Sequence, residues 1–449
     1  MTTSHEHVLV AGSWRPAAAA GTYRAVDPTT GSDRPEVWPQ AAAAAREGSW
    51  RMAMIDRQKN IRSAAFGLGP VVVLPPANFP LAYGAVTGGD FAAAIAGGNP
   101  VIAKAHRSHP AVSLAAAREA LEALRETGLP AATVQLLHGV ADGERLVADP
   151  RVGGTGFTGG QEAGRRLFAA ASAAGRVIWV EMGSINPVVL LPGALAERAA
   201  EIAGELTASV TGSAGQFCTK PGLAFFVDDA AGRAFVTALV AAFGGMGPQV
   251  LLGPTGRDRL QGAVARLRAA GARVLAGGGA TAAGAGPCTH PPTLLEVTAG
   301  ELVADPAGLI VEAFGNATVL VRCGSLAELA RAVACAGGSL GASVYLARGG
   351  ADDAAFAEIG PLLVARAGRV IENRMPTGLA VVPPMQHGGP WPSAGPPFFS
   401  AVGFPWTILR FARRVCFDGV SQPRLPELLR DPPPAGRPWR FIDGGWTRG

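Results

Sequence analysis

Short apolar segments alternate with helix-forming segments from Pro70 onward, and this alternation constrains the fold more than any other feature of the chain. Residues 71–74 are a run of valines and leucine, and residues 100–104 and 134–137 are similar. A helical pattern over 110–127 separates the last two. Strands that are apolar on both faces and alternate with helices form parallel sheets covered on both sides. The pattern therefore predicts an α/β fold with a Rossmann-like parallel sheet.

The same pattern continues along the chain. Further helices are predicted at 82–96, 144–148, 162–174, 194–210, 233–243 and 257–270, and further strands at 154–158, 177–180, 188–191, 223–227 and 318–321. Outside this rhythm, residues 1–69 are expected to be irregular, apart from a short strand at 8–12, a turn at 27–31 and the start of a helix at 41–45. A Gly/Ala-rich surface loop is expected at 276–287, and a last element at 400–414 before a loose tail.

Composition and charge exclude several classes of protein. Hydrophobic residues make up 48% and charged residues 16% of the 449 residues, which is typical of a compact globular protein of about two domains. The net charge of +5 comes without a basic block, so we expect no nucleic-acid partner and no membrane-surface partner. Residues 63–89 carry no charge, but their prolines exclude a membrane helix.

The cysteines and the first residues indicate the compartment. Five widely spaced cysteines without a CxxC pair indicate neither a disulfide framework nor a metal site. The polar residues 1–7 carry no signal-peptide pattern. We therefore expect a cytoplasmic protein.

A cysteine in a glycine-rich segment is the first candidate for chemistry. Cys218 follows Gly215 and Gln216 and precedes Pro221, so its neighbours permit a tight loop that presents the sulfur to a cleft. A nucleophilic sulfur needs a base for itself or for the water that releases its product. Glu181, at the end of an apolar run, is the candidate base. The alternative is that Cys218 is a small buried hydrophobic residue.

Asn78 lies just past the predicted strand at 71–74. Its amide could donate a hydrogen bond to an oxyanion that develops beside a thiolate. An asparagine before a turn often does no more than shape the turn, which is the alternative.

Several charged residues are candidates for binding a nucleotide. Only three of the 39 basic residues are lysines, and Lys104 and Lys220 are two of them. Lys104 ends the strand at 100–104, and the carboxyl ends of parallel strands bind ligands in α/β folds. Arg107 suits a ribose 2′-phosphate better than a free 2′-hydroxyl. Glu312 could hold a ribose diol, or it could be an exposed loop glutamate.

A glycine-rich turn is a candidate for phosphate binding. Residues 154–159 spell GxGxxG, but the first two glycines lie within the predicted strand, so we do not interpret the segment as a dinucleotide fingerprint. Gly159 and Gly160 instead open the next helix, whose first turn contains Gly164. Exposed amides and the helix dipole favour a pyrophosphate there. A plain strand-to-helix turn is the alternative.

Six segments of the chain resemble motifs of the aldehyde dehydrogenase superfamily, and they occur in the order found in that superfamily. The segments that carry the resemblance are Asn78-Phe79-Pro80, Lys104, Phe157-Thr158-Gly159, Glu181-Met182-Gly183, Gly215-Gln216-Phe217-Cys218 and Glu312-Ala313-Phe314-Gly315. Four segments resemble the 2-oxoglutarate semialdehyde (2,5-dioxopentanoate) dehydrogenase branch. They are Lys104-Ala105-His106, Glu181-Met182-Gly183-Ser184-Ile185-Asn186-Pro187, Gly215-Gln216-Phe217-Cys218-Thr219-Lys220-Pro221-Gly222 and His387-Gly388-Gly389-Pro390. The motifs run in register from residue 70 to about residue 420.

The resemblance implies an organisation and partners. It implies an NAD(P)-binding domain at 1–182, a catalytic α/β domain at 183–390, and a C-terminal return at 391–449 that could contribute to oligomerisation. It also implies NADP or NAD as cofactor, a small-molecule aldehyde as substrate, and a homo-oligomer. Arg107 gives NADP a slight preference.

The resemblance also implies roles for single residues. Cys218 would attack the aldehyde as a thiolate, and Asn78 with the Cys218 backbone amide would hold the oxyanion. Hydride would pass to the nicotinamide and leave a thioester, which water activated by Glu181 would hydrolyse. The expected cofactor contacts are Lys104, Arg107, Gly159, Gly160, Gly164, Glu312 and Phe314. The expected substrate contacts are Phe79, Tyr83, Gln216 and Phe217, although apolar packing explains the aromatic residues equally well.

The sequence departs from the family pattern in three places. Residues 32–47 stand where the family has several helices, Gly160 replaces a common serine, and Asn316 replaces the usual proline. The shortened segment motivates an alternative: a non-catalytic homologue that acts as a binding or assembly subunit. Another alternative is a CoA-acylating relative, whose chemistry does not need the base Glu181.

Overall fold

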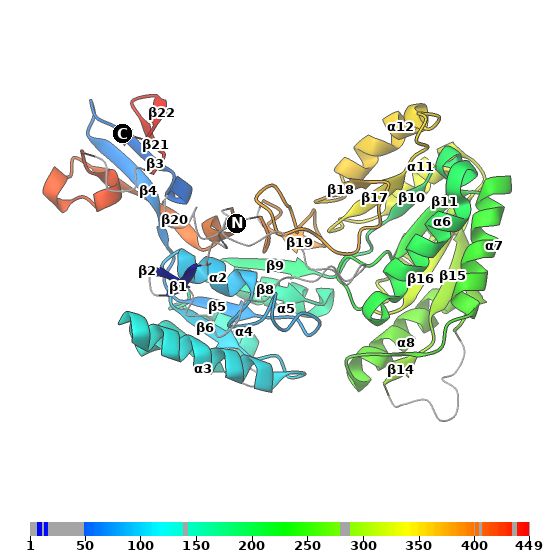
Figure 1. Cartoon of the computed structure of the whole chain (residues 1–449), viewed down its shortest axis with the longest axis horizontal. Coiled ribbons are helices and arrows are strands. Elements are labelled where there is room, and N and C mark those ends of the chain that lie inside the picture. The colour runs from blue at the N-terminus through cyan, green and yellow to red at the C-terminus, as the bar shows by residue number, and fades with distance from the viewer. Residues whose placement is uncertain are drawn as a thin grey trace.

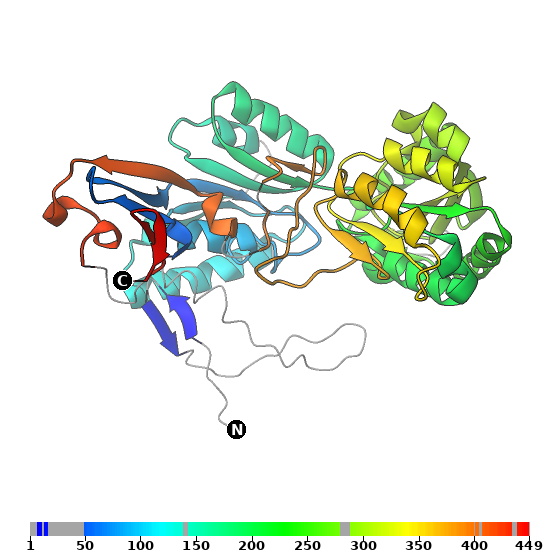
Figure 2. The same ribbon diagram turned by 90° about the horizontal axis from the view of Figure 1, so that it is seen from above.

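The computed structural model describes residues 7–10, 13–16, 49–137, 142–278, 288–398, 400–403, 406–432 and 438–448. Two α/β units lie side by side, each built on its own sheet, and a smaller sheet lies at the outer end of the first unit (Figure 1). Seen from above, the C-terminal segment drawn in orange returns between the two large sheets (Figure 2). The predicted α/β fold with a Rossmann-like parallel sheet is confirmed.

The first unit contains a six-stranded sheet with helices on both faces. The strands in spatial order are β19 (Ala394–Gly395), β9 (Ile178–Met182), β8 (Gly154–Gly159), β5 (Val71–Leu74), β6 (Val101–Lys104) and β7 (Val134–Leu137). All neighbours pair in parallel except β19 with β9. The strand order reverses between β5 and β8, which is the kind of switch point where open α/β sheets bind ligands.

The packing of strand β5 explains why its residues are all apolar. Val71 and Val73 pack among the helices α2 (Gly89–Ala96) and α3 (Pro110–Thr127), while Val72 and Leu74 pack on the other face. That other face is covered by α4 (Asp142–Ala148) and α5 (Gln161–Ala173). Successive side chains of a strand point to opposite faces, so a strand covered on both sides has no polar position.

The second unit contains a seven-stranded sheet. The strands in spatial order are β13 (Arg273–Ala276), β15 (Thr293–Thr298), β16 (Ala317–Cys323), β11 (Leu223–Val227), β10 (Val188–Leu190), β17 (Ala342–Tyr345) and β18 (Val370–Glu372). Only β13 runs antiparallel to its neighbour. One face packs against α6 (Pro192–Thr211) and α7 (Ala230–Gly244). The other packs against α8 (Pro254–Ala269), α9 (Ala299–Ala304), α11 (Leu326–Cys335) and α12 (Asp353–Val364).

A third sheet corrects two expectations. It contains β20 (Ala412–Asp418), β4 (Ile61–Gly67), β3 (Ala53–Asp56), β21 (Arg440–Ile442) and β22 (Gly445–Thr447). The irregular segment expected up to residue 69 and the loose tail expected after residue 414 are therefore both wrong where the structure describes them. The last element expected at 400–414 is also divided, because α13 (Trp406–Leu409) ends before β20 begins. These strands carry little apolar signal of their own, and pairing between the two ends of the chain stabilises them.

The helix expected at 82–96 begins only at Gly89. Hydrogen-bonded turns occupy the preceding residues, with the Gly88 amide donating to the Gly84 carbonyl oxygen. A Cβ atom on Gly84 would lie 2.2 Å from the Pro80 carbonyl oxygen, so these turns are packed too closely for any larger residue at that position. The sequence pattern did not predict these turns because the small residues there were interpreted as the start of the helix.

Smaller elements complete the described chain: β1 (His7–Val10), β2 (Ser13–Pro16), β12 (Gln249–Val250), β14 (Thr289–His290) and α10 (Pro306–Leu309). The expected strand at 8–12 corresponds to β1. The turn expected at 27–31, the helix expected from residue 41 and most of the loop at 276–287 lie outside the described residues. Among the helices that are described, none is long and apolar enough to cross a membrane.

Candidate active site

Cys218 lies on a short loop that bends sharply. Helix α6 ends at Thr211, and a single turn of 3-10 helix, η3 (Gly212–Gly215), leads to the cysteine. Ser213 and Ala214 have φ angles of 50° and 54°, a left-handed conformation that costs a non-glycine residue about 1–2 kcal/mol. Gly215 has a φ of 69°, and a Cβ atom on it would lie 2.2 Å from a backbone oxygen. Strained backbone of this kind is concentrated at functional sites.

Two asparagines hold this loop from opposite sides. Nδ2 of Asn78 donates a hydrogen bond to the carbonyl oxygen of Gln216, at 2.8 Å. Nδ2 of Asn186 donates to the carbonyl oxygens of Cys218 and Lys220, at 2.8 and 3.0 Å. We assigned no role to Asn186 from the sequence, although it belongs to the Glu181 motif. In the structure its side chain is completely buried.

The expected base comes close to the expected nucleophile. Glu181 is the last residue but one of β9, and its register partner on β19 is Ala394. The segment just before the C-terminal return that carries β19 places His387 beside both residues. Nε2 of His387 lies 3.1 Å from Oε1 of Glu181 and 3.4 Å from Sγ of Cys218. The structure thus brings Cys218 and Glu181 to a single imidazole ring, and sequence reasoning had given His387 no role.

Burial shifts the pKa values of both Glu181 and Cys218. Burial raises the pKa of Glu181 to about 8, and the negative charge of Asp90 adds to the rise. Burial, followed by the charges of Glu181 and Glu312, holds the pKa of the Cys218 thiol well above its usual range. The Cys218 residue as a whole is half-buried. Shifts of this size are concentrated at functional sites.

An aromatic cluster adjoins the sulfur. The ring centroids of Phe79 and Phe217 are 5.5 Å apart, and those of Phe79 and Tyr83 are 6.1 Å apart. Tyr83 meets His387 edge-on at 5.9 Å. The Tyr83 hydroxyl is buried and makes no hydrogen bond with the described residues. Three of the four expected substrate residues are therefore neighbours of the cysteine loop.

Gln216, the fourth expected substrate residue, uses its side chain differently. Its Nε2 donates to the carbonyl oxygen of Ser213 at 3.0 Å, and its Oε1 accepts a hydrogen bond from the Leu252 amide at 2.8 Å. Both ends of the amide are thus bonded to backbone groups. This arrangement favours a role in holding the loop.

The β8–α5 turn has the features of an anion site. All of residues 154–159 lie in strand β8, so the GxGxxG spelling does not mark a strand-to-helix turn. Gly160 is the N-cap of α5 and makes no side-chain capping bond, and the space beside it is open. Gly164 lies against Met182, where a Cβ atom would come within 2.5 Å of the sulfur. It therefore lets the helix approach the sheet closely.

The two basic candidates lie at the carboxyl end of β6. Lys104 is its last residue and is half-buried, while Arg107 is exposed three residues later. Both lie at the same edge of the sheet as the carboxyl end of β8. The expected cofactor contacts from the first unit therefore share one edge of its sheet.

Glu312 approaches from the second unit. Its carboxylate lies against Gly183, so that Oε2 would be 2.0 Å from a Cβ atom on that residue. Burial raises the pKa of Glu312 to about 7, and the positive charge of Lys220 opposes the rise. Lys220 is buried and donates a hydrogen bond to the Ala317 carbonyl oxygen at 2.5 Å. Phe314 is half-buried two residues after Glu312.

Asn316 replaces a proline of the family pattern and has a structural role. Its side chain bonds Oε1 of Gln249 at 2.9 Å and the carbonyl oxygen of His290 at 3.0 Å. It also contacts Nδ1 of His290 at 2.9 Å. The residue therefore fastens the Glu312 segment to the short β12–β14 pair.

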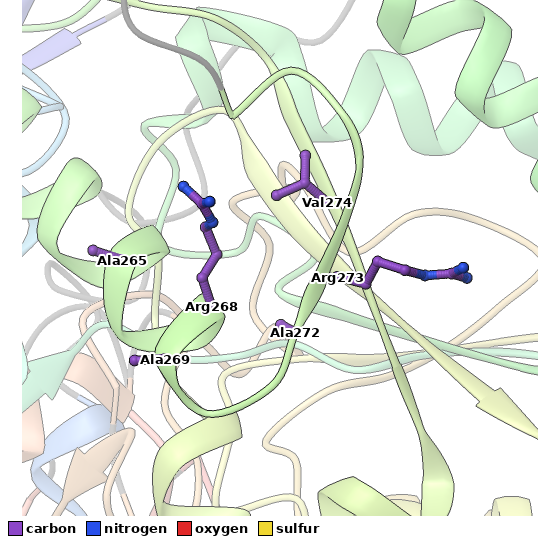
Figure 3. A pocket seen from close by; sticks show the side chains of 6 residues that line it. All are labelled: Ala265, Arg268, Ala269, Ala272, Arg273 and Val274. Atoms are coloured by element: carbon purple, nitrogen blue, oxygen red, sulfur yellow. The ribbon is translucent and has the colours of Figure 1, made fainter.

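A surface hollow of about 520 Å³ lies elsewhere, between α8 and β13. Its lining residues are Ala265, Arg268, Ala269, Ala272, Arg273 and Val274, and the side chains of Arg268 and Arg273 point in different directions (Figure 3). Arg273 is already paired with Glu296. The two cations do not converge on a common point, so we assign no ligand to this hollow.

A Rossmann-like unit and a second α/β unit, with Cys218 and Glu181 meeting at His387, point to the class of protein: an α/β oxidoreductase. The chain belongs to the aldehyde dehydrogenase family, whose sequence pattern matches residues 33–390. It is therefore an oxidoreductase that acts on an aldehyde with a nicotinamide cofactor. The resemblance in the motifs is confirmed.

Two curated relatives are similar over most of the chain. Alpha-ketoglutaric semialdehyde dehydrogenase 2 of Azospirillum brasilense is 38% identical over 417 residues, which cover 90% of this chain and 78% of the relative. Alpha-ketoglutaric semialdehyde dehydrogenase of Acinetobacter baylyi is 34% identical over 375 residues, covering 83% of this chain and 70% of the relative.

Solved structures share the fold at lower identity. Apo betaine aldehyde dehydrogenase of Staphylococcus aureus matches with a TM-score of 0.70 at 17% identity, covering 85% of this chain and 74% of that one. Glyceraldehyde-3-phosphate dehydrogenase GapN of Methanocaldococcus jannaschii, solved with NADP, matches with a TM-score of 0.68 at 19% identity. That match covers 84% of this chain and 78% of GapN.

Proposed function

We propose that this protein oxidises an oxo-acid semialdehyde such as 2,5-dioxopentanoate to the carboxylate, through a thioester on Cys218. The observation that carries the proposal is the meeting of Cys218 and Glu181 at the ring of His387. The printed activity of the relatives from Azospirillum and Acinetobacter supports the choice of substrate.

The residues present fit a nicotinamide cofactor. The open N-terminus of α5 at Gly160 suits a pyrophosphate, with Gly159 before it and Gly164 behind it. Lys104 and Glu312 would hold the two riboses, and Phe314 would pack beside the nicotinamide. The cofactor, when bound, supplies the acceptor for the hydride of the aldehyde.

NADP is the cofactor that we favour, for an electrostatic reason. Arg107 lies exposed past the end of β6, where a ribose 2′-phosphate would meet its guanidinium. NAD, whose 2′-hydroxyl offers no charge, would gain less from this residue.

The protein's own groups account for two stages of the reaction. In the first, the Cys218 sulfur attacks the carbonyl carbon, while the Asn78 amide and the Cys218 backbone N–H bind the oxygen that becomes negative. In the second, deprotonated Glu181 takes a proton from the water that hydrolyses the thioester. The side chains that would line the aldehyde are Phe79, Tyr83 and Phe217. We assign Gln216 to the support of the loop.

The two large sheets suggest how these tasks are divided. We propose that residues 1–182 bind the cofactor, that residues 183–390 carry the nucleophile, and that residues 391–449 contribute to a homo-oligomer in the cytoplasm. The strands β20 and β22 are the edges of the third sheet. Edge strands present unpaired backbone groups to which a second copy could bind.

A direct assay tests the proposal. Purified protein is mixed with NADP or NAD and either 2,5-dioxopentanoate or an uncharged aldehyde of similar length, and the absorbance of the reduced nicotinamide is followed. We expect the highest kcat/KM with 2,5-dioxopentanoate and NADP, free acid as product without added CoA, and no turnover by Cys218→Ala. Turnover by Cys218→Ala would refute the nucleophile.

The alternatives have different outcomes in the same experiment. A non-catalytic homologue is not favoured, because Cys218, Glu181 and Asn78 are all present; it would show no turnover with any aldehyde. A CoA-acylating enzyme would form product only when CoA is added.

A further inference from the structure

His387 is the residue of the site to which the steps above assign no role. It stands in the motif His387-Gly388-Gly389-Pro390, just before the C-terminal return, and its side chain is 2% exposed. Its Nε2 atom is within contact of both reacting groups, 3.4 Å from Sγ of Cys218 and 3.1 Å from Oε1 of Glu181. A ring nitrogen that lies within reach of both a nucleophile and a base has a geometry in which a thiol can be activated.

The fold holds this ring in place. The His387 backbone N–H donates a hydrogen bond to Oγ of Ser400 at 3.1 Å. Gly389 is packed so closely that a Cβ atom on it would lie 2.2 Å from the carbonyl oxygen of Ser339. Tyr83 packs edge-on against the ring. These contacts restrict where Nε2 can lie, as precise proton transfer requires.

The charges around the ring favour a neutral imidazole in the resting protein. The titratable groups that face it are Cys218, Glu181, Tyr83 and Arg369. Burial lowers the pKa of His387 to about 3, and the charge of Arg369 lowers it further. With the ring hydrogen on Nδ1, the lone pair of Nε2 is the acceptor that faces the thiol.

We propose that His387 is a third catalytic residue, which takes the thiol proton of Cys218 as the sulfur attacks the aldehyde. In that step the S–H bond breaks and an Nε2–H bond forms, and the sulfur keeps the electron pair that makes the C–S bond. When hydrolysis of the thioester releases the thiolate, the imidazolium returns the proton to the sulfur. Glu181 takes the proton of the attacking water and passes it to solvent. The proposal rests on the thioester route above.

Thiol alkylation tests this role without any aldehyde. The rate at which iodoacetamide alkylates Cys218 is measured from pH 6 to pH 10, with the Cys218 peptide quantified by mass spectrometry so that other cysteines do not interfere. In His387→Gln we expect the rate at pH 7 to fall at least tenfold and the profile to move to higher pH, with the difference from wild type shrinking toward pH 10. In His387→Ala, added imidazole is expected to restore the rate at pH 7.

Controls separate this role from a structural one. His290→Gln changes another buried histidine, bonded to Asn316, and is expected to leave the alkylation profile within twofold of wild type. Thermal unfolding and NADP titration report whether each His387 variant is folded, and His387→Phe replaces the glutamine variant if that one is not. An unchanged profile, or a loss equal at all pH values and insensitive to imidazole, would overturn the proposal. Failure of the proposed function would instead appear as absent turnover with normal alkylation.

Discussion

The carboxylate of Glu312 lies directly against Gly183, the second residue after Glu181. Both carboxylate oxygens would be within 2.3 Å of a Cβ atom at position 183. Gly183 is therefore the point where Glu312, the proposed cofactor ligand from the second unit, meets the strand end that carries Glu181, the proposed base.

This contact predicts the effect of Gly183→Ala. The added methyl group would displace the Glu312 carboxylate, so we expect the Kd for NADP to rise at least tenfold. Fluorescence titration of the protein with NADP measures it. The matched control is Gly204→Ala in α6, where the space is open and alanine is expected to stabilise the helix by about 0.5–1 kcal/mol. Equal Kd values for the two variants would contradict the assignment of Glu312.

The pKa of Glu181 predicts a rising pH profile. Burial raises this pKa to about 8, and the group acts as a base only when deprotonated, so hydrolysis of the thioester should accelerate as pH rises through about 8. The charge of Asp90 contributes to the rise, and Arg410 opposes it. Asp90→Asn should therefore lower the apparent pKa, and the rising limb of kcat against pH should move to lower pH. A rising limb that stays at the same pH or moves to higher pH would show that another group controls the step.

The Arg410–Asp90 ion pair predicts a large effect on stability. Both side chains are nearly inaccessible, at 3% and 7% exposure, and the pair joins α2 to the segment after α13. Removing one partner leaves a buried charge without compensation, which costs about 3–5 kcal/mol. Urea unfolding of Arg410→Gln should show that loss. Arg125→Gln, which breaks the exposed pair with Glu122, should change the free energy of unfolding by about 0–1 kcal/mol.

Arg107 predicts the cofactor preference. Arg107→Asp should lower kcat/KM for NADP at least tenfold, because an acid repels a 2′-phosphate, and should leave NAD within threefold. Initial rates with each cofactor under otherwise equal conditions measure both values. An equal loss of kcat/KM with both cofactors would show that the ribose 2′-position of the bound cofactor does not lie at Arg107.

Local sequence signals were sufficient for most of the two large sheets. Strands β5, β7 and β11 and helix α3 have the predicted bounds, because short, mostly apolar runs and a proline at a helix start are strong local signals. The third sheet could not be predicted this way. Its strands β4 and β20 pair residues about 350 positions apart, such as Ser63 with Cys416, and only the folded chain brings them together.

The site was predictable to a similar extent. Matching motifs identified Cys218, Glu181 and Glu312, because each belongs to a distinctive run of residues. They gave no role to His387 or Asn186, since a histidine or asparagine acquires one only from its neighbours in space. The motif assigned Gln216 to the substrate, and the structure shows its side-chain amide bonded to the backbone of Ser213 and Leu252.

The covalent intermediate is the central claim, and trapping it is the most direct test. Glu181→Gln is incubated with NADP and 2,5-dioxopentanoate, and the intact protein and its Cys218 peptide are weighed by mass spectrometry. Because the variant lacks the base for hydrolysis, we predict a burst of about one reduced nicotinamide per subunit and an acyl group on Cys218. Steady turnover without an adduct, or an adduct on a different residue, would contradict the account.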